Sequence, residues 1–306
     1  MNRLVIIGNG FDMAHGLKTS YMDFINWYWD QRVKSLLTNH TDTSEDCLCS
    51  LVIKNKEGLN SWHLFSFKNS LFFKDIYNKE RYAGFEFIQE IQKYPEVFSV
   101  KYCPLFENIL QSIETKGWVD IENDYYQLLK DCATNVDSNE TVSELNMQLA
   151  FLQTKLVEYL QTIETDVFRN DLQGAIKDRL NPDDFSTEGK SKALDNIGIN
   201  IADLATIRRN PRKFNKLFPE RTMLLSFNYT ATAEKYKDDN TIYNYIHGRL
   251  DHPENIIFGY GDELDKGYQE IVDKNDNELL RNVKSVKYLE TCLLYTSPSP
   301  RDYAAS

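Results

Sequence analysis

The sequence predicts an α/β protein in which a large, mostly helical insertion interrupts a parallel sheet. An aliphatic run at 3–8 leads into a turn with two glycines, and three short runs of β-branched and aromatic residues follow at 222–228, 241–247 and 255–261. Between them, the apolar residues of about 60–200 recur every three or four positions, which is typical of helices. A strand, a glycine turn, helices and then strands in this order favour a sheet with a helical insertion.

The first strand is expected to be buried on both faces. Residues 3–8 are almost continuously aliphatic, without the polar alternation of a half-exposed strand, and a glycine ends the run. Residues 21–37 have a helical pattern rich in aromatic residues, and the polar stretch 38–60 is expected to form a surface excursion. The longest helix is expected to begin at Thr141 or Ser143, because a glutamate follows closely.

Charge and cysteine content narrow the classes of protein and partner. The chain has 306 residues, of which 46 are acidic and 35 basic, and its net charge of −11 disfavours nucleic acid as a partner. The five cysteines include no CxxC pair, which argues against a metal site and against a disulfide framework. There is no apolar run of about 18 residues and no cleavable leader, so we expect a cytoplasmic protein that does not enter membranes.

The end of the chain differs in composition from the rest. Residues 292–302 match, residue for residue, the translation of an adapter used in sequencing libraries, whereas the alternative is an ordinary disordered tail rich in serine and proline. We therefore expect 292–306 to be non-native and leave it out of the fold prediction. Residues 1–290 are predicted to form a single domain with its helical insertion at about 60–200.

The turn after the first strand contains Gly8 and Gly10 as a G-x-G element. In dinucleotide-binding folds such glycines let backbone N–H groups approach a pyrophosphate at the start of the next helix. The full G-x-G-x-x-G pattern fails, because Met13 occupies the third glycine position. The alternative is that both glycines only allow a positive φ in a tight corner. The residues of the turn alone do not choose between the two.

Several neighbours of this turn carry hydrogen-bonding groups. Asp12 either caps the following helix or belongs to the site, and His15 is either packed or directed at a ligand. Hydroxyl donors a few residues later favour the phosphate interpretation. The candidate ligand-binding residues of this segment are Gly8, Asn9, Gly10, Phe11, Asp12, His15, Thr19 and Ser20.

Two later strands end on polar side chains that suit catalysis. Asn228 and His247 each follow a buried run. Ligands of open α/β sheets bind at the carboxyl ends of the strands, so both are expected to meet the glycine turn. An asparagine offers one acceptor and two donors, and a histidine accepts a proton near neutral pH. The alternative is a turn-forming asparagine and a structural histidine. The expected neighbours of this catalytic pair are Ser226, Tyr229, Thr230 and Gly248.

Four ordered motifs carry a resemblance to a known family. They are "LVIIGNGFDMAHGLKTSYMDF" at 4–24, "GWVDIENDYY" at 117–126, "LSFNYTATAE" at 225–234 and "YIHGRLDHPENIIFGYGDE" at 245–263. Together they resemble the AbiH family of bacterial phage abortive-infection proteins over nearly all of the chain before the tail. The same skeleton resembles, more distantly, the SIR2-like NAD-binding fold. That fold has a glycine-rich loop after its first strand, an asparagine after a central strand and a His-Gly after a later one.

These resemblances imply a Rossmann-like sheet, an NAD ligand and specific residue roles. Gly8 and Gly10 would face the phosphates or the ribose of NAD, Asn228 would orient the nicotinamide ribose or a water, and His247 would act as general base. The chain departs from the pattern at Thr230, where many SIR2-like proteins have an aspartate. It also lacks the zinc-binding cysteine pairs of sirtuin deacylases.

The expected function is therefore an abortive-infection effector that binds NAD and hydrolyses NAD+, without a metal. The alternative is a non-catalytic module that senses NAD or ADP-ribose and acts through a partner, which Thr230 favours. A nuclease-type toxin is a third hypothesis, against which the net charge of −11 argues. A homo-oligomer is compatible with each of the three. Much of the motif at 117–126 is expected to pack as a helix core face, and Glu122 either caps a helix or lines the cleft. Glu234 is expected to be a surface charge, and the acidic loop with Asp262 and Glu263 is a weaker candidate for the site.

Overall fold

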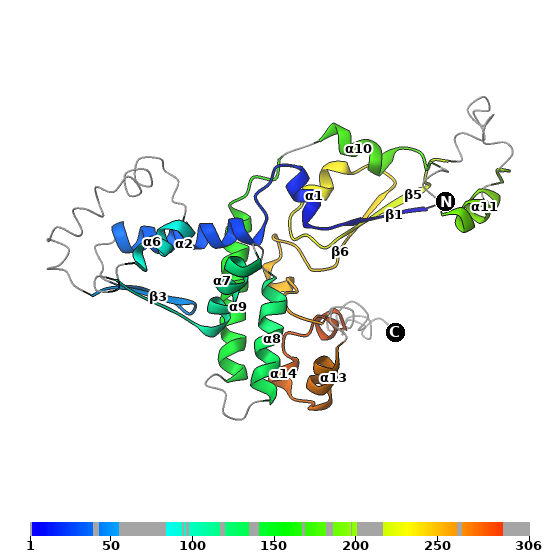
Figure 1. Cartoon of the computed structure of the whole chain (residues 1–306). Helices are drawn as coiled ribbons and strands as arrows, with labels where there is room; N and C mark the ends of the chain where they lie inside the picture. The colour runs from blue at the N-terminus through cyan, green and yellow to red at the C-terminus, as the bar shows by residue number, and fades with distance from the viewer. Residues whose placement is uncertain are drawn as a thin grey trace, which may run out of the picture. The chain divides into compact units, whose positions relative to one another are not determined.

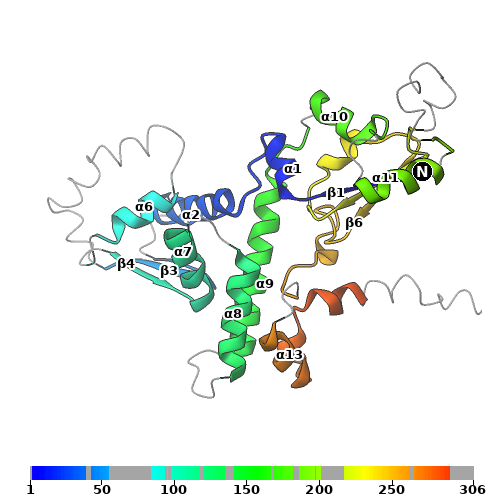
Figure 2. The same cartoon turned by 45° about the vertical axis from the view of Figure 1, so that its right-hand side comes forward.

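The chain forms two compact units, each built from separate segments of sequence. The computed structural model describes residues 2–38, 43–54, 84–93, 95, 98–116, 120–134, 141–166, 169–181, 186–196, 198–200, 217–261 and 265–289. Met1–Lys18 and Ile163–Ile256 form one unit, here called the sheet unit. Thr19–Thr162 and Ile257–Ser306 form the other, here called the helical unit. Figures 1 and 2 follow both units along the chain from blue to red. The tail 292–306 lies outside the described residues.

The sheet unit contains a parallel three-stranded sheet. Its strands are β1 (Asn2–Ile7), β5 (Arg221–Ser226) and β6 (Thr241–Tyr245), in the order β1-β5-β6. Ile7 lies opposite Ser226, which lies opposite Tyr245, so the three carboxyl ends meet at one edge of the sheet. The predicted mixed α/β fold with a parallel sheet is confirmed at this level. The other elements of the unit are α1 (Asn9–Ala14), α10 (Asn170–Lys177), α11 (Thr187–Asn196), η4 (Thr232–Tyr236) and η5 (Pro253–Asn255).

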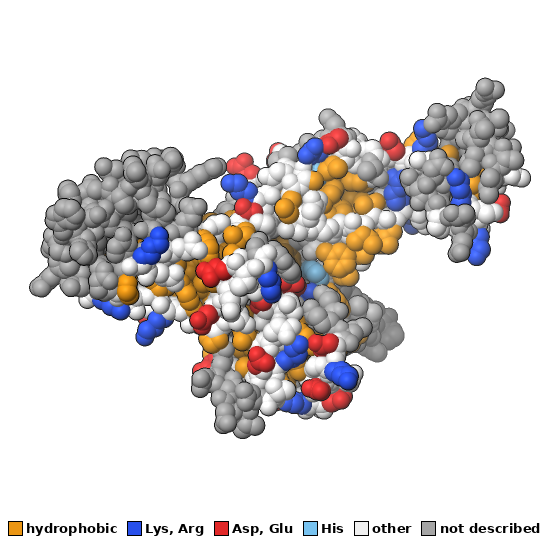
Figure 3. Space-filling model, in the orientation of Figure 1, with side chains coloured by type: hydrophobic (Ala, Val, Ile, Leu, Met, Phe, Trp, Pro, Cys, Tyr) orange, Lys and Arg blue, Asp and Glu red, His pale blue; other side chains and the backbone are white. Residues whose placement is uncertain are grey.

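The described residues of the sheet unit cover one face of this sheet. Ile7 and Leu224 pack on that face against Ile176 of α10 and against Ala233 and Tyr236 of η4. The prediction that β1 is buried on both faces is therefore wrong. The connection from β1 to β5, through α10, and the connection from β5 to β6, through η4, thus pack on the same face of the sheet. Figure 3 shows hydrophobic side chains at the surface of the molecule. The exposed apolar side chains of the other face are Leu4 (57 %), Ile6 (68 %), Met223 (37 %) and Ile242 (45 %).

The helical unit combines four longer helices with a small antiparallel sheet. Its core contains large, fully buried aromatic side chains, among them Phe24, Trp29, Phe106, Tyr125 and Tyr126. The four helices are α2 (Tyr21–Thr38), α7 (Pro104–Lys116), α8 (Ile121–Thr134) and α9 (Val142–Gln161). The sheet consists of β2 (Thr43–Glu45), β3 (Cys49–Ile53) and β4 (Phe98–Tyr102), in that order. Three shorter helices are α6 (Gly84–Ile91), α13 (Lys266–Asp273) and α14 (Asn277–Leu280).

Two local predictions for this unit have opposite outcomes. The helix α9 begins as expected: Thr141 is its N-cap, and Glu144 completes a reciprocal capping box with it. The stretch 38–60 is not simply a surface excursion, since it contains β2 and β3. Leu48 and Leu51 of this stretch are fully buried, because the hairpin packs its apolar residues into the core of the unit.

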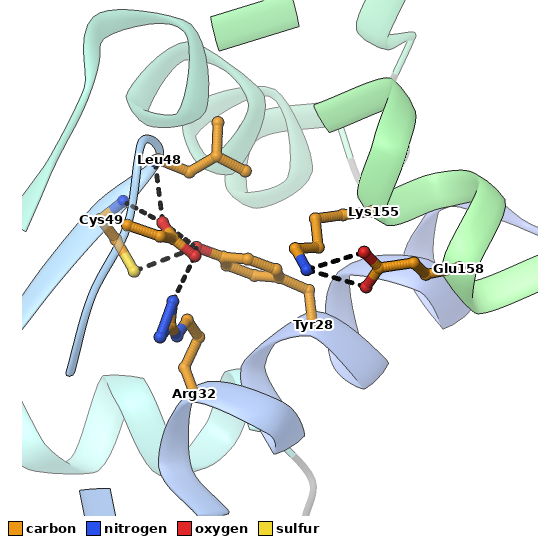
Figure 4. Close-up of polar contacts among 7 residues, drawn as sticks. Tyr28, Arg32, Leu48, Cys49, Lys155 and Glu158 are labelled. Atoms are coloured by element: carbon orange, nitrogen blue, oxygen red, sulfur yellow. Dashed lines mark hydrogen bonds and ion pairs between the residues drawn. The ribbon is translucent and has the colours of Figure 1, made fainter. Parts of the chain in front are cut away.

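A partly buried carboxylate attaches this hairpin to α2. Asp46 accepts hydrogen bonds from the Tyr28 hydroxyl at 2.9 Å and from the backbone N–H groups of Leu48 and Cys49 at 2.9 and 3.1 Å. Arg32 forms an ion pair with the same carboxylate. Figure 4 shows Tyr28 and Arg32 converging on this point from one helix. Burial, together with the neighbouring Cys49 and Asp46, raises the pKa of Tyr28 far above its usual value, so its hydroxyl remains a donor.

The run 255–261, predicted as a strand, is not one. It starts at the end of η5 and pairs only through a single bridge between Tyr260 and Val283. Gly261 has a φ of +129°, which interrupts an extended strand. In the parts of the chain that the structure describes, no helix is long and apolar enough to cross a membrane.

Candidate functional site

The carboxyl ends of the three parallel strands are joined by side-chain hydrogen bonds. The Asn228 amide, just after β5, donates from Nδ2 to the carbonyl of Gly8 at 3.0 Å, just after β1. The His247 ring, just after β6, lies with Nδ1 3.2 Å from the carbonyl of Phe227. The structure thus brings together Gly8, Asn228 and His247, as the sequence predicts.

Neither glycine of the first turn is required by a positive φ or by close packing. Gly8 is the N-cap of α1 with a φ of −124°, a position where glycine is well tolerated, and neither Gly8 nor Gly10 has a positive φ. A Cβ atom added to either glycine meets none of the described residues within 4 Å. The alternative of a corner that needs positive φ is therefore wrong for both. Gly16 fills that role instead: its φ is +77°, and it ends α1 with N–H bonds from Gly16 to Met13 and from Leu17 to Asp12.

Asp12 is a buried residue of α1 and not a helix cap. Its side chain is 1 % exposed, and Oδ2 accepts a hydrogen bond from the Thr230 hydroxyl at 2.6 Å. Thr230 in turn accepts one from the Thr232 hydroxyl at 3.1 Å. The other carboxyl oxygen of Asp12, Oδ1, is buried and has no hydrogen-bond partner in the structure described.

His15 is a packed histidine. Its Nδ1 lies 2.7 Å from the Phe11 carbonyl, and its Nε2 lies 2.6 Å from the Tyr236 hydroxyl. The ring packs against those of Phe11 and Tyr236, with centroids 4.5 and 5.6 Å away. Because both ring nitrogens bond within the protein, His15 has none left for a ligand, and of its two predicted roles the packed one is correct.

Asn228 is held by the residue at the end of β5. Ser226 is 1 % exposed, and its hydroxyl accepts a hydrogen bond from the Asn228 N–H at 3.2 Å. This short turn positions the asparagine, so Ser226 acts on the backbone. The Asn228 side chain uses Nδ2 for Gly8. Its Oδ1 accepts no hydrogen bond from the described residues, which leaves one strong acceptor for a water or a hydroxyl group.

The ring of His247 is oriented by a backbone carbonyl. A carbonyl can only accept, so Nδ1 donates to Phe227, and in this tautomer Nε2 is the ring nitrogen that can accept a proton. This tautomer is assigned from the hydrogen-bond partner. The ring lies edge-on to Phe227, with centroids 5.3 Å apart, and 6.2 Å from the ring of Tyr229. These aromatic neighbours limit how the ring can turn.

The turn after His247 contains a set of contacts that the sequence did not reveal. Gly248 has a φ of +85°, and an added Cβ would lie 2.5 Å from the Asn255 carbonyl oxygen, so local packing alone requires this glycine. Arg249 forms ion pairs with Glu234 at 2.5 Å and Asp251 at 2.9 Å. Glu234 is thus an ion-pair partner of this turn. The opposite charges of Glu234 and Arg249, in the motifs 225–234 and 245–263, are the sequence signal that points to this pair.

The family model described as "Bacteriophage abortive infection AbiH" matches residues 4–293. The chain belongs to the AbiH family. Neither the curated proteins nor the solved structures gave a match. The likeness to SIR2-like proteins stays a prediction.

Two predicted site residues of this AbiH protein belong to the helical unit. Ser20 precedes α2, and its hydroxyl accepts the Asp23 N–H at 3.1 Å while donating to the Asp23 carboxylate at 2.5 Å. This is a helix cap, which fully accounts for the serine. Thr19 lies beside it in the same unit. Thr19 and Ser20 therefore belong to a different unit from the strand ends. In the sheet unit, Asn9 and Phe11 lie in α1, and Tyr229 lies beside His247.

The AbiH motif at 117–126 is used for packing where it is described. The Glu122 carboxylate accepts from the Gly259 N–H at 3.1 Å and from Lys284 at 2.8 Å, and Lys284 is 3 % exposed. Burial raises the pKa of Glu122, although Lys284 acts in the opposite direction. Asp124 accepts from the Ser112 hydroxyl at 2.9 Å. These contacts favour the packing interpretation of Glu122. Asp262 and Glu263 lie outside the described residues.

A search of the described ranges finds no group of three or more histidine, cysteine, aspartate or glutamate side chains that could hold a metal ion.

Proposed function

We propose that this protein binds NAD at the joined strand ends of its sheet unit and hydrolyses NAD+ as the effector step of phage abortive infection. The role in abortive infection comes from its family. The observation that carries the NAD proposal is the pair Gly8 and Gly10, which neither φ nor packing requires. Glycines at these positions leave the backbone open to the close approach of a ligand, as in dinucleotide-binding turns, and this supports the proposal.

The proposed reaction breaks the N-glycosidic bond between nicotinamide and ribose. The bonding electrons leave with nicotinamide, the ribose becomes oxocarbenium-like, and the oxygen of a water bonds to its anomeric carbon. Asn228 Oδ1 is the free acceptor that would orient this water or a ribose hydroxyl. His247 Nε2 would take the proton that the water loses. Fixed dipoles aimed at a developing positive charge lower the barrier most.

The test measures NAD+ in phage-infected cells that express the wild-type chain, and in reactions with the purified protein. We expect NAD+ to fall with the wild-type chain, and to persist with Asn228→Ala combined with His247→Ala. His252→Ala is the matched control, because the side chain of this histidine is exposed and lies beside Glu254 on a surface turn. Equal loss of NAD+ in the double variant, or no loss with the wild-type chain, contradicts hydrolysis at this site.

A second candidate function is a nucleotide sensor without hydrolysis. The observation in its favour is Thr230, which stands two residues after Asn228, where many SIR2-like proteins have an aspartate. Thr230 supplies no carboxylate, and it donates its hydroxyl proton to Asp12. Calorimetry that detects NAD or ADP-ribose binding, together with unchanged NAD+ after infection, would favour the sensor over the hydrolase.

A further inference from the structure

One buried carboxyl oxygen in the sheet unit lacks a partner. Asp12 is 1 % exposed, and it is the one acidic side chain that is buried in the described part of this unit. Its Oδ1 atom has no hydrogen-bond donor among the described residues. Buried acceptors are nearly always satisfied, because an unmade hydrogen bond to a charged group is costly. This oxygen therefore calls for a donor that the described chain does not supply.

The neighbours of Asp12 keep it an acceptor. Thr230 donates its only hydroxyl proton to Oδ2 at 2.6 Å, and Thr232 donates its own to Thr230 at 3.1 Å. The chain of hydroxyls thus ends on one carboxyl oxygen. The other oxygen is left with its acceptor capacity unused.

The position of Asp12 relates this oxygen to the glycine turn. Asp12 lies in the six-residue helix α1, two residues after Gly10 and one turn after the N-cap Gly8. The same turn is tied to Asn228 through the Gly8 carbonyl. A carboxylate repels a phosphate at this range, whereas it attracts a hydroxyl or an amide N–H.

We propose that Asp12 Oδ1 accepts a hydrogen bond from an uncharged donor of the bound dinucleotide. The donor is a ribose hydroxyl or the nicotinamide carboxamide, so the first turn receives the nicotinamide riboside end and the pyrophosphate lies elsewhere. This inference rests on the proposed NAD site. The resemblance left open whether Gly8 and Gly10 face the phosphates or the ribose of NAD, and this inference chooses the ribose.

The experiment is calorimetry of the full chain with NAD+, nicotinamide riboside and AMP. Asp12→Asn keeps the size of the side chain and can still accept from Thr230, but it presents an amide N–H where Oδ1 stands. We expect the affinity for NAD+ and for nicotinamide riboside to fall about tenfold or more, while the affinity for AMP stays within about twofold. Equal affinity of wild type and Asp12→Asn for NAD+ overturns the inference and assigns Oδ1 to an internal water.

A second variant keeps the test valid if Asp12→Asn folds poorly. Gly10→Ala adds a Cβ into space that no described atom occupies, so the fold is preserved. We expect it to weaken nicotinamide riboside and to leave AMP unchanged, whereas the opposite pattern would place the phosphates at the turn and overturn the inference.

Two further comparisons distinguish a failure of the proposed function from a failure of this inference, and a ribose hydroxyl from the carboxamide as the donor. Absence of NAD+ binding by the wild-type chain contradicts the proposed function itself, whereas binding that ignores Asp12 contradicts only this inference. Loss of ADP-ribose affinity in Asp12→Asn assigns the donor to a ribose hydroxyl. Retention of ADP-ribose affinity beside a loss of NAD+ affinity assigns it to the carboxamide.

Discussion

The side-chain amide of Asn228 donates a hydrogen bond to the carbonyl of Gly8 at 3.0 Å, across 220 residues of sequence. This bond fixes the ends of β1 and β5 relative to each other beyond the backbone ladder of the sheet. It also holds Asn228 with its amide oxygen unused. Contacts of this kind position the candidate site at the strand ends, whereas other contacts only stabilise the fold, and substitutions should distinguish the two.

Alanine at Gly10 and at Gly248 should have opposite effects on stability. Gly10→Ala fills open space within α1, where alanine is favoured by about 0.5–1 kcal/mol, so the melting temperature should stay the same or rise. Gly248→Ala forces a Cβ against the Asn255 carbonyl at a φ of +85°, which should cost about 1–3 kcal/mol. Thermal unfolding of both variants decides this, and a loss of stability in Gly10→Ala would show that the turn is a tight corner.

Tyr236→Phe should destabilise the protein without weakening nucleotide binding. The hydroxyl bonds to His15 Nε2 at 2.6 Å and to the Arg169 backbone, and Tyr236 is fully buried. Leaving these groups without a partner costs about 1–3 kcal/mol. Denaturant unfolding measures the loss and calorimetry measures NAD binding. A large drop in affinity would instead place His15 at the ligand.

The buried pair Glu122 and Lys284 should be hard to break singly and easy to replace together. Glu122→Leu removes the carboxylate that Lys284 contacts at 2.8 Å, at a site where Lys284 is 3 % exposed, so we expect a loss of about 3–5 kcal/mol. The double variant Glu122→Leu with Lys284→Met removes both charges and should recover most of this loss. A double-mutant cycle by denaturant unfolding tests the coupling, and additive losses would contradict it.

Asp265 should make stability fall in acid. Hydrogen bonds from the Tyr126 hydroxyl and the Tyr268 N–H, with Lys130 nearby, lower the pKa of Asp265 to about 2. A carboxyl whose pKa is lowered by folding stabilises the folded state above its unfolded pKa of about 4, and this contribution is lost as the pH falls from about 4 to about 2. The stability difference between wild type and Asp265→Asn should therefore shrink between about pH 4 and about pH 2 in unfolding measurements. A constant difference would mean that Asp265 is not held in this way.

Local sequence patterns were sufficient to predict which residues lie at the strand ends, but they could not predict the side-chain contacts between residues far apart in the sequence. Asn228 and His247 could be placed because each ends an apolar run, and parallel strands bring such ends together. The tie between His15 and Tyr236 spans 221 residues, and that between Glu122 and Lys284 spans 162, so no local pattern could reveal them. The run 255–261 was wrongly predicted as a strand because the roles of its two glycines cannot be read from composition. Gly259 lies so close to the Asn282 carbonyl that a Cβ would not fit, and Gly261 has a φ of +129°.

The separation between Gly8 and Asn228 also sets the order of events during synthesis. A ribosome that adds about 5–20 residues per second needs on the order of 10 to 40 s to make the 220 residues that lie between them. Throughout this interval β1 has been made but has no neighbouring strand, and its exposed aliphatic residues are a natural substrate for chaperones that act on nascent chains. The hydrogen bond between Gly8 and Asn228 can thus form only after β5 has been made, long after β1.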